Sequence, residues 1–437
     1  MVRFRFVRHS FVKIKKRKIQ RFLSSRTKIF WTNLHLNFRF VCVTFFVMKI
    51  KRDIEGVVKR AAACYRVVTV MGPRQSGKTT LCRMAFSEKP YISLENPDVQ
   101  ERAIEDPISF LGQYRSSGVV LDEIQNAPEL LSFIQGIVDE DDREGQFILT
   151  GSHQFSLIEG ISQSLAGRTA LIRLLPFSIA ETEKIKSLEQ LDEYIFSGFY
   201  PDVWNRGLEP TNYYRDYFET YVQRDLRQMI QIKNLRLFRN FVRLCAGRIG
   251  QNFNAANLAN NLGVSSHTIQ SWVSVLEASY ILYLMEPFSG NIGKRLVKSP
   301  KLYFYDVGFA AYLLGFGSSD SIFTDRMRGA LFENLVVMEL LKGRYNQNKE
   351  DHLFFYRDKQ QHEVDLLLKN GARFDAIEIK SSATFTKEFL KGLGYLKKVM
   401  TDSLGASFLV YAGEQSGTIG DVQMVHYKEA VQKILLK

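Results

Sequence analysis

The sequence predicts an α/β protein in which a parallel sheet covered by helices is followed by a helical region and a second, C-terminal α/β unit. Three observations predict this order. Short apolar runs alternate with helical segments over residues 54–152, which is typical of a parallel sheet with helices on both faces. Helical periodicity then continues through residues 181–244. Strand patterns return after residue 328.

The composition is that of an ordinary globular protein. The 437 residues suggest two or three domains, and 45% hydrophobic with 24% charged residues excludes a disordered, collagenous or coiled-coil chain. The four cysteines are far apart and form no CxxC pair, so neither a disulfide framework nor a cysteine zinc site is indicated, and we expect a cytoplasmic protein. No apolar run approaches the ~20 residues that span a bilayer, so we expect no membrane partner.

The net charge of +13 is concentrated at the start of the chain. Residues 1–47 contain twelve Lys or Arg and no acid, which leaves residues 48–437 with +1. This leader is a targeting peptide, a nucleic-acid-binding arm, or spurious translation upstream of Met48. We favour the third interpretation, with no ordered structure expected, because an ordinary mixture of charges begins abruptly at Met48. Peptides from residues 1–47 in natively expressed protein would contradict it.

The first domain is expected over residues 48–180. A helix is expected over residues 54–63, with others over 81–86 and 107–114, and the predicted strands are 66–71, 91–94, 119–121 and 147–150. The carboxyl ends of parallel strands meet at one edge of a sheet, so the polar residues that follow these strands should converge there.

A glycine loop follows the first strand and precedes a helix. Its sequence, GPRQSGKT, matches G-x-x-x-x-G-K-[ST], whose backbone N–H groups curl around phosphates. Lys78 should reach the β/γ-phosphates, and Thr79 should offer its hydroxyl to Mg²⁺. The alternative is a glycine turn with an incidental lysine. We predict an ATP site containing Gly72, Pro73, Arg74, Gln75, Ser76, Gly77, Lys78, Thr79 and Thr80.

The strand over residues 119–121 ends in two acids. Asp122 is expected to hold Mg²⁺, which is the Walker B role, and Glu123 can orient or deprotonate the attacking water, so the pair favours ATP hydrolysis over simple binding. The alternative is an ordinary strand terminus.

Three further residues are weaker candidates. Ser152 follows the strand over residues 147–150 and could sense the γ-phosphate, or simply make a turn. Arg168 is a candidate arginine finger that would act on a neighbouring subunit in a homo-oligomer; the alternative is a surface ion pair. Arg224 is weaker still, because a helical Arg followed by Asp usually makes a local ion pair.

Six segments in order resemble a known family: VMGPRQSGKTTL, VVLDEIQNAPELL, FILTGSHQFSL, LAGRTALIRLLPFS, YVQRDLRQ and KRLVKSPKLYFYDVGFAAYLLG. Together they are similar to prokaryotic AAA-type P-loop ATPases that carry a C-terminal domain of unknown function with a winged helix and a nuclease-like end. The resemblance runs from about Met48 to the C-terminus. It implies the P-loop and Walker B roles given above and establishes no substrate. His153 departs from the smaller or amide residue expected there.

The middle of the chain is expected to form a helical lid or linker over residues 181–245 and a winged helix over residues 246–327. Residues 254–276 have the rhythm of two helices about a turn, the helix-turn-helix motif. The second helix carries no Lys or Arg, so phosphate contacts must come from elsewhere. Basic residues occur between 206 and 248 and in an expected wing with Lys294, Arg295, Lys298 and Lys301. The alternative is an ATPase lid or a protein-docking surface.

The last domain, residues 328–437, contains a spaced set of acids. Asp365 and Glu378 lie on predicted neighbouring strands, and Lys380 shares a strand face with Glu378. Glu333 on the preceding helix could complete a Mg²⁺ site for phosphodiester cleavage, with Lys380 positioning water. These four residues resemble the PD-(D/E)xK nuclease pattern, which also survives in inactive binding modules.

The sequence therefore predicts a Mg²⁺-dependent ATPase whose hydrolysis is coupled to binding or remodelling DNA. One alternative is a nucleotide-gated binding module that acts on a protein partner. The other is a metal-dependent nuclease regulated by ATP.

Overall fold

The computed structural model describes residues 50–152, 160–161, 163–222, 234–289 and 297–436. The leader over residues 1–47, His153, Arg224, Lys294 and Arg295 lie outside the described residues. Within this part of the chain, no helix has both the length and the apolar composition needed to cross a bilayer.

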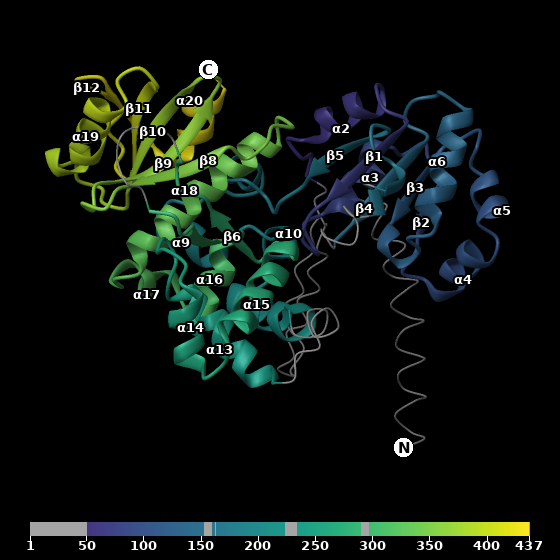
Figure 1. The fold of residues 1–437 in the computed structure, drawn as a ribbon, viewed down its shortest axis with the longest axis horizontal. Helices are drawn as coiled ribbons and strands as arrows, with labels where there is room; N and C mark the ends of the chain where they lie inside the picture. Colours follow the sequence, from purple (N-terminus) through teal and green to yellow (C-terminus); the bar gives the residue numbers. More distant parts are fainter. Residues whose placement is uncertain (1–49, 153–159, 162, 223–233, 290–296, 437) are drawn as a thin grey trace, which may run out of the picture. The chain divides into compact units, whose positions relative to one another are not determined.

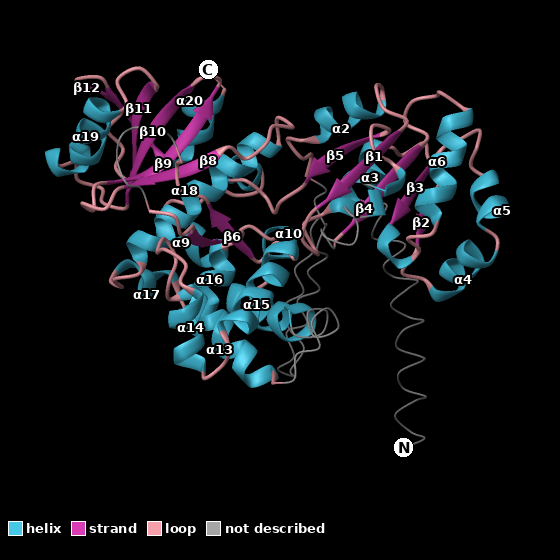
Figure 2. Ribbon diagram, in the orientation of Figure 1, coloured by secondary structure: helices cyan, strands magenta, loops and turns pink. Residues whose placement is uncertain are grey.

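The first domain is a five-stranded parallel sheet between helices (Figures 1 and 2). The sheet order is β2-β3-β4-β1-β5, and neighbouring strands pair in parallel, including Met71 with Gly151 and with Arg173. Its elements are α2 (Glu55–Ala62), β1 (Val67–Met71), α3 (Lys78–Ala85), β2 (Tyr91–Ser93), α4 (Pro97–Glu105), α5 (Pro107–Gly112), β3 (Val119–Asp122), η1 (Ile124–Asn126), α6 (Leu130–Glu140), β4 (Phe147–Gly151) and β5 (Thr169–Arg173).

Alternate residues of β1, which lies between β4 and β5, face opposite layers. Val68 and Val70 pack in a buried cluster with residues of α2 and α3, whereas Val67 and Met71 pack in a second cluster with residues of α4, α5 and α6. Both faces are therefore covered, as the continuous apolar runs predict. The predicted P-loop NTPase sheet is confirmed, with the glycine loop at the carboxyl end of β1.

A helical region follows the first domain, as predicted. It contains α8 (Ile179–Glu183), α9 (Leu191–Ser197), α10 (Pro201–Arg206), α11 (Pro210–Tyr217), the π-helical turn η2 (Phe218–Val222), α13 (Leu235–Ala246), α14 (Ala255–Leu262), α15 (Ser266–Ala278), β6 (Leu282–Met285), β7 (Lys301–Phe304), α16 (Val307–Leu314) and α17 (Ser319–Phe323). Gly263, at φ 67°, ends α14, and the Ser265 side chain caps α15 by accepting from the Thr268 N–H. Strands β6 and β7 then pair antiparallel.

The C-terminal domain begins with a long buried helix and continues as a six-stranded mixed sheet of order β12-β13-β11-β10-β9-β8. Its elements are α18 (Arg328–Tyr345), β8 (Leu353–Arg357), β9 (Glu363–Asn370), β10 (Arg373–Lys380), η3 (Lys387–Leu390), α19 (Lys391–Val399), β11 (Leu404–Tyr411), β12 (Gly417–Ile419), β13 (Val422–His426), η4 (Tyr427–Glu429) and α20 (Ala430–Leu435). The predicted second α/β unit is confirmed.

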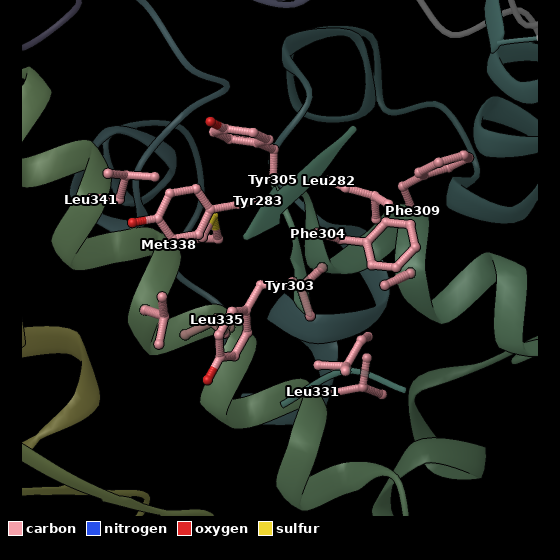
Figure 3. Close-up of a cluster of buried hydrophobic side chains, with 14 of the residues drawn as sticks. Leu282, Tyr283, Tyr303, Phe304, Tyr305, Phe309, Leu331, Leu335, Met338 and Leu341 are labelled. Carbon is pink, nitrogen blue, oxygen red and sulfur yellow. The ribbon is translucent and has the colours of Figure 1, made fainter. Parts of the chain in front are cut away.

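Helix α18 joins this domain to β7. The side chain of Asn334 accepts from the Phe304 N–H at 2.7 Å and donates to the Phe304 carbonyl at 2.8 Å, so it pairs with the end of β7 as another strand would. Figure 3 shows Tyr303 and Phe304 among the apolar side chains of α18, including Leu331 and Leu335. Lys301, which was expected at the end of a basic wing, therefore begins a buried strand.

The packing also contradicts part of the predicted basic wing. Lys298 is exposed, but Lys301 is only 1% exposed and its ammonium group is held by carboxylates. A lysine in that position cannot contact the phosphates of a nucleic acid. The prediction that Lys301 contributes to a basic surface is wrong.

Candidate functional site

The glycine loop after β1 is shaped by two glycines. A Cβ at Gly72 would lie 2.0 Å from the Leu174 carbonyl oxygen, so only glycine fits beside β5. Gly77 caps α3 at φ 93°, a conformation that side chains with a Cβ rarely adopt. The loop therefore brings the N-terminus of α3 to the carboxyl edge of the sheet, where an anion can meet free N–H groups.

Lys78 is folded back onto this loop. Its ammonium group donates to the carbonyls of Gly72 and Pro73 at 3.0 and 2.9 Å, and the residue is 4% exposed. Burial lowers the pKa of Lys78, while the nearby Glu123 and Asp122 carboxylates oppose that shift. The lysine thus lies over the loop with carbonyl partners that a phosphate could replace.

Asp122 is surrounded by hydroxyl groups from three other elements. Thr79 donates to its two carboxylate oxygens at 3.1 and 2.9 Å, Tyr91 donates at 2.6 Å, and Thr150 donates as well. The structure therefore brings together Thr79 and Asp122, which sequence reasoning placed in one Mg²⁺ site. Tyr91 and Thr150 were not predicted as neighbours of Asp122.

Glu123 lies beside Asp122 in a strained backbone conformation. Its φ is 57°, which is uncommon for a residue other than glycine and is typical of functional sites. Ser152 donates to its carboxylate at 2.9 Å, and Gln125 donates to the same oxygen. Burial alone would raise the pKa of Glu123, but the Lys78 charge and these hydrogen bonds hold it below its ordinary value. The carboxylate is therefore ionised.

The other loop residues have separate environments. Arg74 lies 3.5 Å from Glu95, and the side-chain oxygen of Gln75 accepts from Tyr213 at 2.7 Å. The buried Ser76 hydroxyl has no hydrogen-bond partner among the described residues. Thr80 lines a cavity of about 330 Å³ with Gly77, Lys78, Thr79 and Glu123.

Sequence reasoning missed Arg52, which supports the loop from behind. Its buried guanidinium donates to the Ser76 carbonyl at 2.8 Å, to the Leu175 carbonyl at 2.7 Å and to Glu181 at 2.9 Å. The Arg52 guanidinium carbon also lies 4.9 Å from the Phe177 ring centre. Because these partners are 24 to 129 positions away along the chain, no local pattern signals the role.

Arg168 makes a surface ion pair. It contacts both oxygens of Asp139, at 2.6 and 2.8 Å. Val67 at the start of β1 pairs with Thr169, so Arg168 lies at the amino ends of these two strands. The P-loop follows the other end of β1, about 17 Å away along the strand at ~3.3 Å per residue. Arg168 therefore does not reach the P-loop of its own chain.

The C-terminal acids form two linked groups. Lys380 lies 3.0 Å from Asp365 and 2.7 Å from Glu378, and the Ile379 N–H donates to Asp365 at 2.8 Å. Burial and the Asp365 charge raise the pKa of Glu378 to about 8. The second Glu378 oxygen has no partner among the described residues. The structure thus brings these three predicted residues together.

Glu333 belongs to the second group. One of its oxygens accepts from Lys301 at 3.0 Å and from Tyr303 at 2.5 Å, and Lys301 also lies 2.6 Å from Glu363. Within the described ranges, no group of three or more His, Cys, Asp or Glu side chains is arranged to hold a metal ion. The ammonium of Lys301 therefore takes the oxygen that Glu333 was expected to offer to a metal.

Comparisons with known proteins agree with these observations. An AAA domain matches residues 65–183, and two domains of unknown function, DUF8612 and DUF4143, match residues 188–320 and 328–430. The uncharacterised proteins Rv2008c of Mycobacterium tuberculosis and Mb2031c of Mycobacterium bovis are each 31% identical to this chain over 338 residues, which are 76% of this chain and 74% of each relative.

The chain belongs to the family of these relatives, the AAA-type ATPases that carry the DUF4143 domain at the C-terminus, and the predicted resemblance is confirmed. Among solved structures, the Walker-type ATPase PABY2304 of Pyrococcus abyssi matches 61% of this chain and 96% of its own. Its sequence identity is 14% and its TM-score is 0.43, which is too low to add to the assignment.

Proposed function

We propose that this chain binds ATP with Mg²⁺ at the P-loop and hydrolyses it. The observation that carries the proposal is the convergence of Lys78, Thr79, Asp122 and Glu123 at the carboxyl edge of one parallel sheet. In this arrangement the Lys78 ammonium exchanges the two loop carbonyls for phosphate oxygens. The N–H groups at the start of α3 stabilise the same negative charge.

The residues around Asp122 fit a magnesium ion. Mg²⁺ prefers hard oxygen ligands, and the Thr79 hydroxyl and Asp122 carboxylate lie within 3.1 Å of each other. These two groups would hold the ion, which would neutralise charge on the β- and γ-phosphates when bound.

Glu123 supplies the base in this proposal. Its carboxylate is ionised and is oriented by Ser152 and Gln125, so it can accept a proton from a water that attacks the γ-phosphate. The proton passes to a Glu123 oxygen as the water oxygen bonds to phosphorus, and ADP leaves. Ser152 acts here by orienting the base rather than by touching phosphate.

Calorimetry with ATP and Mg²⁺ tests the binding step. The wild-type chain should bind ATP, and Lys78→Ala should weaken binding at least tenfold in protein that circular dichroism shows to be folded. Arg168→Ala is the matched control, since Arg168 lies at the other end of the sheet. Equal binding by wild type and Lys78→Ala would rule out the P-loop as the site.

Coupling to DNA is the finer part of the proposal. Helix α13 presents the exposed Arg236 and Arg243, and Lys298 is exposed in the segment before β7. Phosphate contacts by such residues give affinity that falls steeply with salt. Replacing Arg236 and Arg243 with Gln should weaken DNA binding at low salt and reduce its salt dependence. If the wild-type chain binds no DNA at low salt, the partner of the ATPase is a protein.

The nuclease alternative rests on Asp365, Glu378 and Lys380. The two acids are hard oxygen ligands that Lys380 already holds side by side, and the unpartnered Glu378 oxygen could meet a cation. Glu333 does not join them unless Lys301 moves. A Mg²⁺- or Mn²⁺-dependent cleavage assay on DNA and RNA, with Asp365→Ala as the inactive control, decides this alternative.

A further inference from the structure

The nucleotide cavity extends from the P-loop to helix α10. Beyond the phosphate end, its walls include the apolar side chains Ile50, Met84, Phe177 and Pro201. A cavity of about 330 Å³ with apolar walls suits a flat aromatic ring, since ligand sites of this size bury most of a small ligand. If the triphosphate occupies the P-loop, as proposed above, this end is where the base would lie.

Helix α10 presents one polar face to this cavity. Pro201, Asp202 and Asn205 all line it, which agrees with helical spacing. The other side of α10 is fixed, because Val203 is buried and the Trp204 indole N–H donates to the Gly198 carbonyl at 2.9 Å. The helix therefore cannot rotate freely, and the polar face is held toward the cavity.

The polar side chains at this end already have partners, with one exception. The Arg52 guanidinium donates to the Ser76 and Leu175 carbonyls and to the Glu181 carboxylate. One oxygen of Glu55 accepts from Lys59 at 2.8 Å, and one oxygen of Asp202 accepts from Arg206 at 3.4 Å.

The exception is the side-chain oxygen of Asn205. It is buried and has no hydrogen-bond partner among the described residues. Asn205 lines the cavity, and a buried polar atom without a partner calls for a hydrogen-bonding group that a ligand can supply.

We propose that Asn205 recognises the nucleotide base and selects adenine through its exocyclic 6-amino group. The Asn205 oxygen accepts from that amino group, and the neighbouring amide N–H₂ can donate to an adjacent ring nitrogen. An asparagine amide pairs in this way with adenine in protein–DNA complexes, because each offers one donor beside one acceptor. The inference rests on the proposed ATPase function and adds the residue that sets base selectivity.

Comparing ATP with purine riboside triphosphate, which lacks only the 6-amino group, tests the inference. In calorimetry on the full chain with Mg²⁺, the wild-type protein should bind ATP about threefold to tenfold more tightly than purine riboside triphosphate. This is the range expected for one neutral hydrogen bond. Asn205→Leu should bind the two nucleotides equally, because it loses more affinity for ATP than for the analogue. Lys298→Met, on the exposed segment before β7, is the control and should keep the wild-type ratio.

The ratio within one protein is the readout, so a modest loss of stability in a variant does not obscure the result. Asn205→Ala provides a second variant if Asn205→Leu does not fold. An unchanged ratio in a folded Asn205 variant, or equal binding of both nucleotides by wild type, would overturn the inference and leave the ATPase proposal standing. Failure of the wild type to bind either nucleotide would overturn both.

Discussion

Thr79 donates its hydroxyl to both carboxylate oxygens of Asp122, at 3.1 and 2.9 Å, although 43 positions separate the two residues. Thr79 lies in the first turn of α3, and Asp122 ends β3. Strands β1 and β3 are both neighbours of β4 and run parallel, so the loops after the two strands begin at the same edge of the sheet.

Asp122→Asn should weaken one of the two expected magnesium ligands. We expect turnover to fall by about two orders of magnitude and the Mg²⁺ concentration for half-maximal activity to rise, because an amide oxygen binds a hard cation more weakly than a carboxylate. Phosphate release measured across a Mg²⁺ titration checks this. Tyr91→Phe removes a hydrogen bond to Asp122 and keeps the carboxylate, so it should change the magnesium requirement little.

Glu123 should give no acid limb in the pH profile of turnover. Its pKa is held below the ordinary value, so the carboxylate stays ionised from pH 8 down to about pH 5.5. The stability that its partners contribute is present above the unfolded-state pKa and is lost as pH falls through the folded-state pKa. A fall in turnover with a midpoint near pH 6.5 in the wild-type protein would contradict this assignment.

The buried pair Glu339 and Lys342 should be important for stability. Glu339 accepts from the Ile179 N–H at 2.8 Å, and Lys342 donates to Glu339 and to the Phe177 carbonyl, each at 2.8 Å. Lys342→Met leaves a buried carboxylate without its cation and should cost about 3–5 kcal/mol in the free energy of unfolding. Urea titration measures this cost. The double variant Lys342→Met/Glu339→Gln should recover part of this free energy. If the losses of the two single variants simply add in the double variant, the two residues are not coupled.

Lys301 should act in stability rather than in nucleic-acid binding. Lys301→Met leaves Glu333 and Glu363 facing each other without their shared cation, so the melting temperature should fall by several degrees. Magnesium or calcium at millimolar concentration should restore part of the loss in the variant. Lys298→Met, on the exposed segment nearby, should not change the melting temperature.

Glu277 should make stability fall as the pH rises above 5. Burial and the Glu286 charge raise the pKa of Glu277 to about 7, above the ordinary value of 4.5. Its stabilising contribution is complete below pH 4.5 and is lost as the pH rises through 7. Glu277→Gln should therefore raise the melting temperature more at pH 8 than at pH 5. An equal change at both values would contradict the shift.

The sequence was most informative where a motif follows a strand. The buried runs before Gly72, Asp122 and Gly151 predicted β1, β3 and β4, because continuous apolar residues are needed where both faces of a sheet are covered. Strand β5 was not predicted. It lies at the sheet edge, and its residues Thr169–Arg173 are alternately buried and more exposed, so no continuous apolar run marks it.

Long-range partners explain the other differences between prediction and structure. Lys301 stands near other basic residues in the sequence, which suggested a solvated surface, but Glu333 and Glu363 draw it into the protein. Arg52 and Asn205 stand outside any recognisable motif. The contacts of Arg52 and the proposed role of Asn205 depend on carbonyl groups and a cavity that only the folded chain assembles.

The most direct test of the central claim is phosphate release from ATP and Mg²⁺ by wild-type protein and Glu123→Gln, with ATP binding measured in the same samples. Loss of the base should lower turnover at least a hundredfold while ATP stays bound, because Lys78 and the P-loop are unchanged. Equal turnover in the two proteins, or no turnover by a wild type that binds ATP, would contradict hydrolysis at this site. The second result would instead indicate a nucleotide-gated binding module.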